Sequence, residues 1–333
     1  MTQYFRPLAQ TDPIRPTDAI PIAGGWTWFT HAERLTRDGD AEIVAAGDVP
    51  TDVLGRISGA RGAIAGLSVD QPRLMGIVNV TPDSFSDGGD FSDRQLAVAH
   101  GLALAQAGAD ILDIGGESTR PGAAVVPIKE EIARTEPVLS DLRAKLPNPL
   151  SIDTRKHDVA RAAVGAGARI VNDVSALSYD PQIIDLVKES GVDLCLMHAQ
   201  GDPESMQNDP HYDNVVLDVY DYLNARVSDA VSAGVPREKI IIDPGIGFGK
   251  TQAHNLALVR NISLFHTLGC PILLGVSRKR FIGNIAGVDQ AEDRASGSVS
   301  VALEGLRQGV QIIRAHDIEA HRQAFSLWRA LHT

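Results

Sequence analysis

The segment MGIVNVTPDSFSDGGD, residues 75–90, decides the fold because it joins a buried strand to a polar loop. The apolar run Leu74–Val78 is too short for a helix and is followed closely by Pro82, so it predicts a strand buried on both faces, as parallel strands are. Asn79 lies at the carboxyl end of that strand, and the loop after it is rich in oxygens that suit a metal ion or a phosphate ester. Taken alone, the segment is equally compatible with an ordinary loop between a strand and a helix.

From residue 73 onward, short β-branched runs alternate with longer helical patterns, which is typical of consecutive βα units and a parallel sheet. The predicted strands are Leu74–Val78, Ile111–Ile114, Leu150–Ile152, Ile170–Val171, Asp193–Met197, Ile240–Ile242, Ile272–Leu274 and Gln311–Ile313. The predicted helices are Arg94–Ala107, Lys129–Lys145, His157–Gly165, Pro181–Ser190, Val215–Ala233, His254–Leu268, Asp293–Gln308 and Ile318–Leu331. Eight such units predict an α/β protein with a closed (β/α)₈ TIM barrel over residues 73–333.

Residues 1–72 show no βα rhythm and are predicted to form an N-terminal extension of unknown role. We expect a small hairpin around Ala19–Arg37 and a short helix around Asp52–Ser58, packed over the N-terminal end of the barrel. Two tryptophans in the segment GGWTWFTH are interpreted as packing anchors, since no chemical motif accompanies them.

Composition restricts the class of protein. The chain has 333 residues, 44% of them hydrophobic, and a formal net charge of −11, so it can bury a large core but offers no broad basic face for nucleic acid or an anionic membrane. Only Cys195 and Cys270 occur, which is no disulfide framework or zinc motif. The start MTQYFRPLAQTDPIRP does not resemble a signal peptide, and no apolar run is long enough to span a membrane. We expect a soluble cytoplasmic protein.

Polar side chains follow all eight predicted strands, at the end of the barrel where active sites of this fold lie. Any single one could be a helix cap, but the full set is hard to explain as structure alone. Asp153, Asn172 and Asp243 are expected to converge in the barrel mouth, where two carboxylates and a carboxamide match the donors and acceptors of a 2-amino-pyrimidinone ring. Lys279 is expected to approach the same carboxylates or a carbonyl and nitrogen of the ring.

A second group of strand ends predicts an anion site. Arg314 and His316 follow the eighth strand, which neighbours the first strand and its Asn79 in a closed barrel. Two cations beside a carboxamide suit a phosphate together with a magnesium ion. We expect this site to be separate from the carboxylate cluster.

Two further motifs are weaker. The segment Gly245–Gly249 resembles a phosphate-binding turn but lacks the P-loop ending, so we interpret its glycines as letting the loop pass close to a flat ligand, with Phe248 as an apolar wall. His198 is interpreted as a structural or ligand-positioning residue rather than a metal ligand, because no second His or Cys lies at ligand spacing.

An ordered set of motifs closely resembles the dihydropteroate synthase family. The motifs are MGIVNVTPDSFSDGG, DIGGESTRPGA, SIDTRKHDVA, IVNDVSAL, CLMHAQG, IIDPGIGFGKT, LLGVSRKRFIG and IIRAHD, from about residue 73 to the end. The resemblance implies a pterin-binding barrel that joins 6-hydroxymethyl-7,8-dihydropterin diphosphate to 4-aminobenzoate, releasing diphosphate and forming 7,8-dihydropteroate. It also implies a homodimer, a magnesium cofactor and inhibition by sulfonamides. Two departures, Ala199 where Met is often seen and Ala176 where Gly is common, remove no charge or donor.

The resemblance also assigns roles residue by residue. It implies that the pterin contacts Asp153, Asn172, Met197, Asp243, Phe248 and Lys279. It implies that the aminobenzoate lies among Thr119, Arg120, Pro121 and Ser277, with Phe248 beside them. Diphosphate is assigned to Arg314 and His316, and magnesium to Asn79, with Asp87 or another acid of the first loop as a further ligand or a support for the cation. The expected catalytic residues are therefore Asn79, Asp87, Lys279, Arg314 and His316.

Three rival functions remain open at this stage. A methyltetrahydrofolate-type pterin-binding methyltransferase would share the carboxylate cluster but needs no diphosphate site. A non-catalytic pterin-binding protein would be expected to lack Asn79 or the pair Arg314 and His316. A Schiff-base aldolase would use Lys279 as its nucleophile. The diphosphate motifs favour the synthase, with a dissociative mechanism in which the loops Pro82–Asp90 and Ser118–Val125 exclude water.

Overall fold

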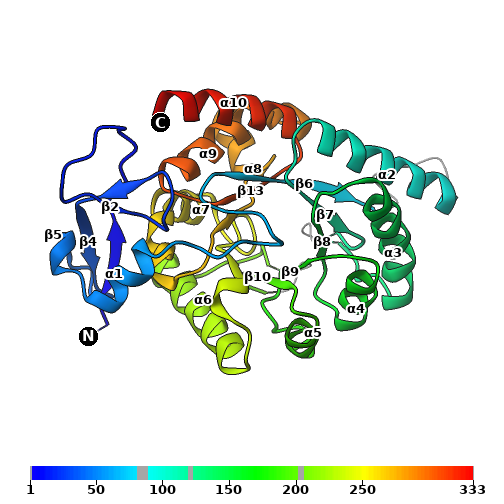
Figure 1. The fold of residues 1–333 in the computed structure, drawn as a ribbon, viewed down its shortest axis with the longest axis horizontal. Coiled ribbons are helices and arrows are strands. Elements are labelled where there is room, and N and C mark those ends of the chain that lie inside the picture. The colour runs from blue at the N-terminus through cyan, green and yellow to red at the C-terminus, as the bar shows by residue number, and fades with distance from the viewer. Residues whose placement is uncertain (1, 81–88, 119–122, 202–205, 333) are drawn as a thin grey trace.

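The computed structural model describes residues 2–80, 89–118, 123–201 and 206–332. Its central sheet has eight parallel strands in the order β11-β10-β9-β8-β7-β6-β13-β12. These strands are β6 (Arg73–Asn79), β7 (Ile111–Gly115), β8 (Leu150–Asp153), β9 (Ile170–Asp173), β10 (Asp193–Met197), β11 (Ile240–Asp243), β12 (Leu273–Leu274) and β13 (Ile312–Ala315). A parallel bridge between Ile242 and Ile272 joins the two ends of the sheet. The predicted TIM barrel is therefore confirmed (Figure 1).

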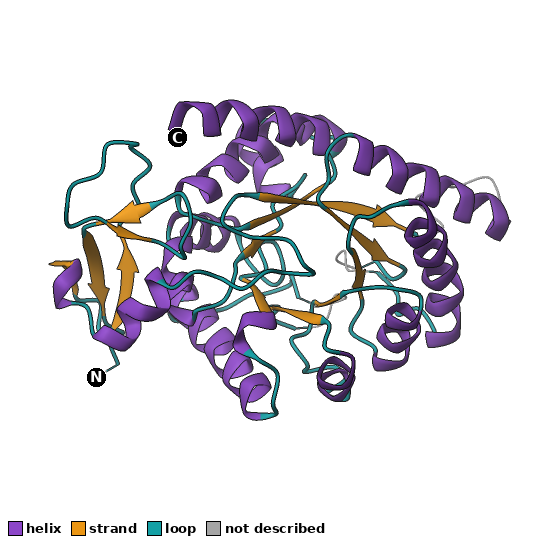
Figure 2. Ribbon diagram, in the orientation of Figure 1, coloured by secondary structure: helices purple, strands orange, loops and turns teal. Residues whose placement is uncertain are grey.

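Helices surround these strands (Figure 2). They are α2 (Gly89–Gln106), α3 (Ile128–Lys145), α4 (His157–Gly165), α5 (Ile183–Ser190), α6 (Val215–Ser232), α7 (Gln252–Arg260), α8 (Arg280–Ala286), α9 (Ala295–Arg307) and α10 (Ile318–His332). The helix predicted over His254–Leu268 is wrong as a single element. It is divided at Asn261 into α7 and the 3₁₀ helix η4 (Ile262–Leu268). The short helix α8 was not predicted, because the polar residues before it read as loop.

Most barrel strands continue into the polar residues that were predicted to follow them. The bounds of β8, β9 and β11 include Asp153, Asn172 and Asp243, because a backbone ladder does not depend on the polarity of the side chains it carries. Parallel pairing sets Asp153 directly opposite Asn172. These polar residues therefore sit on the rigid sheet rather than on mobile connections, which fixes the positions of their side chains.

The N-terminal ends of the barrel strands are covered by a segment that precedes β6. Ile64 and Val69 are buried against residues at or near the starts of barrel strands, including Ile111, Ile170 and Ile312. Each buried aliphatic side chain contributes roughly 1.5–3 kcal/mol to stability, relative to leaving it exposed. This contact places residues 64–69 of the extension over the N-terminal end of the barrel and leaves the opposite end for chemistry. Packing of the expected hairpin and short helix over that end stays a prediction.

The rest of the extension forms a small β structure beside the barrel (Figure 1). It contains β1 (Tyr4–Pro7), β2 (Ile20–Pro21), β3 (Trp28–Phe29), β4 (His31–Leu35), β5 (Ala41–Ala45) and α1 (Thr51–Ser58). Within the range 19–37, β2 pairs with β3 as a hairpin, but β4 pairs with β1 and β5 instead, so the single predicted hairpin is only partly correct. Arg37 forms ion pairs with Asp218 and Asp221 of α6, which tie the extension to the barrel.

Candidate active site

The carboxyl ends of the barrel strands bring the predicted ring-binding residues together. Asp153 of β8 and Asn172 of β9 are neighbours in register, and Asp243 of β11 is paired with Met197 of β10. All four residues are buried. The structure thus places two carboxylates, a carboxamide and an apolar side chain on successive strands of one rim, as the sequence predicted.

Arg314 links this cluster to a carboxylate that the sequence analysis missed. Its Nε donates to Asp113 Oδ2 at 2.6 Å, and its Nη2 donates to Asp153 Oδ2 at 2.8 Å. Asn172 Nδ2 also donates to Asp113 Oδ2, at 3.0 Å. The separation that we expected between the carboxylate cluster and the anion site therefore does not hold at Arg314, which spans from β13 to the carboxylates of β7 and β8.

Electrostatics sets the protonation of this cluster. Burial raises the pKa of Asp153 to about 7, although Arg314 opposes the shift. Burial likewise raises the pKa of Asp243 to about 6, while a hydrogen bond from the Gly245 backbone lowers it. Burial lowers the pKa of Arg314, but its two aspartate partners outweigh this and keep it fully protonated.

Two acceptor atoms in the cluster have unused capacity. Within the described part of the chain, Asp113 Oδ1 and Asp153 Oδ1 are buried and accept no hydrogen bond. A buried acceptor left without a donor costs about 1–3 kcal/mol, so the cluster favours a ligand that supplies N–H groups. The edge of a 2-amino-pyrimidinone ring has such groups.

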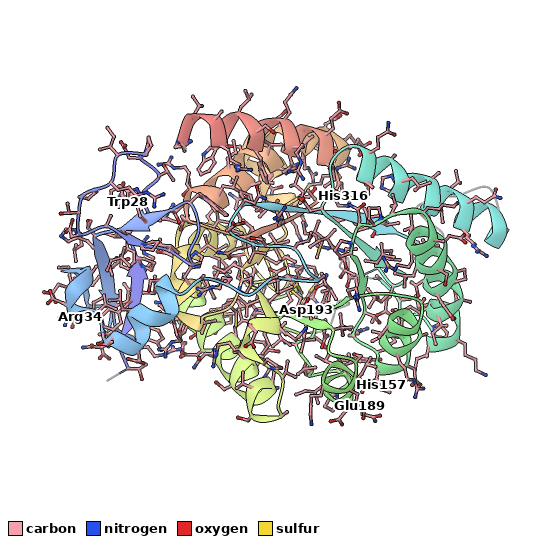
Figure 3. All side chains as sticks on the ribbon, in the orientation of Figure 1. Trp28, Arg34, His157, Glu189, Asp193 and His316 are labelled. Carbon is pink, nitrogen blue, oxygen red and sulfur yellow. The ribbon has the colours of Figure 1, made fainter. Side chains whose placement is uncertain are left out.

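Ser277 and His316 form the opposite side of the mouth. The Ser277 hydroxyl lies 2.9 Å from His316 Nδ1 and accepts a hydrogen bond from the His316 backbone N–H at 3.1 Å. These contacts fix the imidazole between β12 and β13. Figure 3 shows His316 in the barrel, well apart from Trp28 of the N-terminal extension.

Asn79 ends β6, which lies between β7 and β13, and the register sets Arg314 opposite Met75, four residues before Asn79. The expected proximity of Asn79 to Arg314 stays a prediction. No group of three or more His, Cys, Asp or Glu side chains suited to a metal occurs in the described residues. A single carboxamide oxygen nevertheless fits magnesium, because Mg²⁺ usually keeps several waters and takes substrate phosphate oxygens as ligands rather than an all-protein cage.

The glycine-rich turn Gly245–Gly249 carries Phe248, whose ring contacts Lys279, another predicted ring-binding residue. Lys279 Nζ lies 4.1 Å from the centre of the Phe248 ring, a cation–π contact. Phe248 and Met197 also line a cavity of about 150 Å³. His198, just after β10, lies 2.9 Å through Nδ1 from Lys250 Nζ. Burial lowers the pKa of His198 to about 2, so the ring is neutral, which supports a structural role for this histidine.

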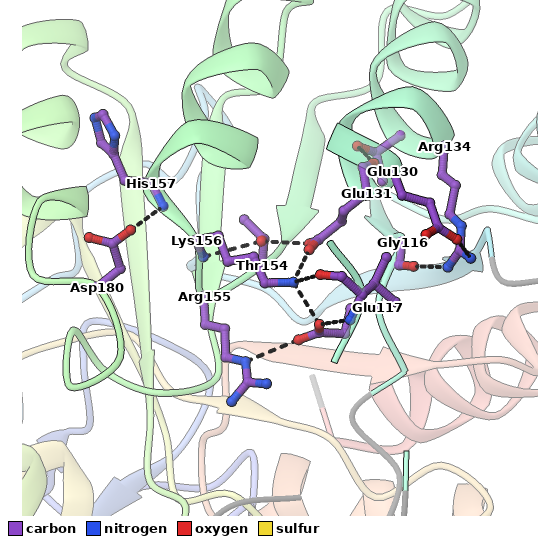
Figure 4. A network of polar contacts seen from close by, with 12 residues as sticks. Gly116, Glu117, Glu130, Glu131, Arg134, Thr154, Arg155, Lys156, His157 and Asp180 are labelled. Carbon is purple, nitrogen blue, oxygen red and sulfur yellow. Dashed lines mark hydrogen bonds and ion pairs between the residues drawn. The ribbon is translucent and has the colours of Figure 1, made fainter. Parts of the chain in front are cut away.

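A buried network joins the second strand's loop to the third strand's end (Figure 4). Lys156 Nζ donates to Glu117 Oε2, Glu131 Oε2 and the Val126 carbonyl, each at 2.6 Å. Arg155 donates to Glu117 Oε1 at 3.0 Å. Two cations paired with two carboxylates make the network neutral, so it supports the structure beside the site and adds no net charge to it.

Several assigned residues lie outside the described residues, namely Asp87, Thr119, Arg120 and Pro121. Their roles stay predictions. Asp113 and Lys250 were not assigned by sequence reasoning. A signal for Asp113 was present, because it is the one charged residue in the otherwise apolar run that forms β7.

Comparison with known proteins defines the class first. The model of the family described as pterin binding enzyme matches residues 75–316. A dihydropteroate synthase of Neisseria meningitidis serogroup B is 46% identical over 270 residues, which cover 80% of this chain and 94% of that protein. The fold, the buried acceptor cluster and this match all indicate a barrel enzyme that binds pterins.

Solved structures identify one family within this class of pterin-binding enzymes. Xanthomonas albilineans dihydropteroate synthase with 4-aminobenzoic acid has a TM-score of 0.77 and 48% identity, covering 81% of this chain and 97% of that one. A structure of the same enzyme with 7,8-dihydropteroate has a TM-score of 0.73 and 44% identity, covering 80% and 95%. The chain belongs to the dihydropteroate synthase family of pterin-binding enzymes.

Proposed function

We propose that this chain is a dihydropteroate synthase that joins 6-hydroxymethyl-7,8-dihydropterin diphosphate to 4-aminobenzoate. The observation that carries the proposal is the buried cluster in which Arg314 bridges Asp113 and Asp153, each with one unused acceptor oxygen. Relatives that are dihydropteroate synthases share this fold, and solved structures of one hold 4-aminobenzoic acid or 7,8-dihydropteroate.

The buried hydrogen-bond acceptors of the cluster determine how the pterin ring is bound. Asp153 and Asp243 accept the N–H groups of the pterin edge, and Asn172 supplies its carboxamide oxygen because its Nδ2 donates to Asp113. Met197, at the buried end of β10, provides an apolar contact for the ring. Together these groups hold the ring so that its methylene–diphosphate substituent points towards Arg314 and His316.

The chemical step is a dissociative substitution at the methylene carbon. The carbon–oxygen bond to diphosphate breaks, the bonding electrons leave with diphosphate, and the electron-rich pterin ring delocalises the positive charge. Arg314 and His316 bind the departing anion. The aromatic amine, neutral at pH 7, then donates its lone pair to the carbon and releases a proton to solvent. No protein base is required before the bond breaks.

Magnesium fits this scheme as a counter-ion. Asn79 would hold it together with diphosphate oxygens and water, and the ion would neutralise part of the charge on the leaving group. Asp87 is proposed as a further ligand or as support for the cation. The proposal predicts that removal of divalent ions slows diphosphate release, which an assay with EDTA and added Mg²⁺ measures.

Ser277 and Phe248 are proposed to frame the 4-aminobenzoate, with Thr119, Arg120 and Pro121 as the remaining contacts. Lys279 lies against the Phe248 ring, where its charge can meet the carboxylate of the aminobenzoate or the ring carbonyl of the pterin. A role for Lys279 as a Schiff-base nucleophile is disfavoured by the family match.

We also propose a cytoplasmic homodimer. The family resemblance supports the dimer, and two buried cysteines that form no disulfide support a reducing compartment. No helix among the described residues is long and apolar enough to cross a membrane. Sedimentation analysis of the purified chain would test the dimer, and a monomer at micromolar concentration would contradict it.

An activity assay tests the proposed function. Purified protein is given the pterin diphosphate and 4-aminobenzoate, and both diphosphate and dihydropteroate are measured. Equal amounts of the two products support synthesis. Release of neither product would contradict the function.

A further inference from the structure

Lys250 is a buried amine to which the proposed reaction assigns no task. It is 3% exposed, and its Nζ donates to the Phe248 carbonyl at 3.0 Å and to the His198 carbonyl at 3.3 Å. The same Nζ lies 2.9 Å from His198 Nδ1. Burying an amine is costly unless hydrogen bonds replace its water, and here three contacts do so. These three contacts therefore fix the position of the Lys250 side chain.

These contacts join two chain segments that already approach closely. Gly245 has φ +67°, and a Cβ built on it would lie 1.8 Å from the His198 carbonyl oxygen. At Gly249, with φ +61°, a Cβ would lie 2.4 Å from the Gln200 carbonyl oxygen. Only glycine permits this approach of backbone to backbone. Through its hydrogen bonds to the carbonyls of Phe248 and His198, Lys250 holds the glycine turn against the segment that follows β10.

The turn held in this way carries Phe248. The Phe248 carbonyl is one acceptor of Lys250, while the Phe248 ring lies under Lys279 Nζ at 4.1 Å. The neighbouring Gly247 also packs on this side chain, since a Cβ there would lie 3.0 Å from Lys279 Cδ. Movement of the turn would therefore move both the aromatic ring and the cation above it.

We propose that Lys250 is a positioning residue for the aromatic substrate: by fixing the backbone of the glycine turn, it sets the Phe248–Lys279 pair against which 4-aminobenzoate binds. This inference rests on the proposed function, because it assigns the pair to that substrate. It goes further in naming the group that holds the pair in place. Lys250 itself touches neither substrate.

The charges around Lys250 agree with a positioning role. Burial lowers the pKa of Lys250 to about 7, Asp243 acts in the opposite direction, and Lys279 adds to the lowering. Both a charged and a neutral amine can donate to the two carbonyls. Only the charged amine has a third N–H, which neutral His198 can accept at Nδ1.

A double-mutant cycle tests the proposal. The variants are Lys250→Met, Phe248→Ala and the double variant, compared with the parent in steady-state kinetics with 4-aminobenzoate varied. The methionine side chain is nearly as long as that of lysine but cannot donate hydrogen bonds to the two carbonyls. In the parent background, K250M is expected to raise the KM for 4-aminobenzoate about tenfold, the effect of losing a hydrogen bond of ordinary net strength. Affinity for a diphosphate-free pterin should fall less, because that ring is also held by Asp153, Asn172 and Asp243, which Lys250 does not position.

The cycle separates positioning from general damage. If Lys250 acts through Phe248, K250M should change the KM by less than about twofold once Phe248 is alanine, because coupled residues are not additive. The same tenfold rise in both backgrounds would overturn the proposal, as would an equal loss of pterin affinity. Should K250M not fold, Lys250→Gln, which keeps one donor, should give a smaller rise with the same loss of effect in the F248A background. An inactive parent would refute the proposed function instead, so the two failures are distinguishable.

Discussion

Replacing Arg314 by methionine is predicted to weaken binding of a diphosphate-free pterin, even though this ligand has no anion for the arginine to bind. The reason is the pair of hydrogen bonds, at 2.6 and 2.8 Å, from the guanidinium to Asp113 and Asp153. Without that cation, the pKa of Asp153, already raised to about 7, should rise further. At pH 7, Asp153 would then be mostly protonated and a poorer acceptor.

The size of the effect follows from these contacts. A hydrogen bond to a charged group contributes about 1.5–3 kcal/mol and a neutral one about 0.5–1.5 kcal/mol, so the loss should be about 1–1.5 kcal/mol, or roughly tenfold in Kd. Breaking a buried ion pair also costs about 3–5 kcal/mol of folding stability when the charge left behind stays buried, an upper limit here because Asp153 can take up a proton. Thermal denaturation of R314M should show this destabilisation.

Titration calorimetry with 6-hydroxymethyl-7,8-dihydropterin measures the effect on binding, at pH 7 and at pH 8.5. Arg94→Met is the matched control, since Arg94 makes two 2.8 Å hydrogen bonds to Asp141 between helices α2 and α3, away from the strand ends. R314M should bind weakly at pH 7 and recover part of its affinity at pH 8.5, while R94M binds like the parent. Parent-like binding by R314M at pH 7 would refute the role that we give to Arg314 in the ring site.

Three further outcomes are expected. Asp153→Asn or Asp243→Asn should weaken pterin binding by roughly 1.5–3 kcal/mol, because the ring's donors lose an ionic acceptor; calorimetry showing parent-like affinity for both variants would count against this. Pterin affinity of the parent should fall as the pH decreases from 8 to 5, because the pKa values of about 7 and about 6 mean that Asp153 and Asp243 take up protons over this range; a pH-independent Kd would exclude that assignment. Sulfonamides should inhibit competitively with 4-aminobenzoate, since an aryl amine with an anionic sulfonamide has a similar shape and charge; an unchanged KM for 4-aminobenzoate in the presence of inhibitor would disprove shared occupancy.

The barrel was predictable because each buried parallel strand appears in the sequence as a short apolar run, and the polar residues at strand ends mark the active face. Element boundaries were less predictable. The helical pattern continues through Asn261, where the backbone leaves the α-helical region at φ −112° and ψ 19°, and local sequence does not contain the tertiary contacts that decide this. Pairing of β4 with both β1 and β5 is likewise set by long-range contacts.

The site shows the same limit. Side-chain chemistry predicted Asp153, Asn172 and Asp243, because each is a polar residue directly after an apolar run in the sequence, and the structure places all three at the carboxyl ends of β8, β9 and β11. Asp113 was missed although its charge interrupts the apolar run of β7, because it lies two residues before the end of that strand, and polar residues were sought only after the strand ends. The reach of Arg314 across β6 to β7 and β8 depends on barrel closure, which brings β13 beside β6. Sequence therefore predicted the members of the rim more reliably than the contacts between them.

The most direct test of the central claim is the ratio of dihydropteroate formed to diphosphate released, measured with and without 4-aminobenzoate. A dihydropteroate synthase should give a ratio near one with the aromatic amine present, and should form no dihydropteroate in its absence. Diphosphate release that yields only hydrolysed pterin, whether or not 4-aminobenzoate is added, would contradict the account.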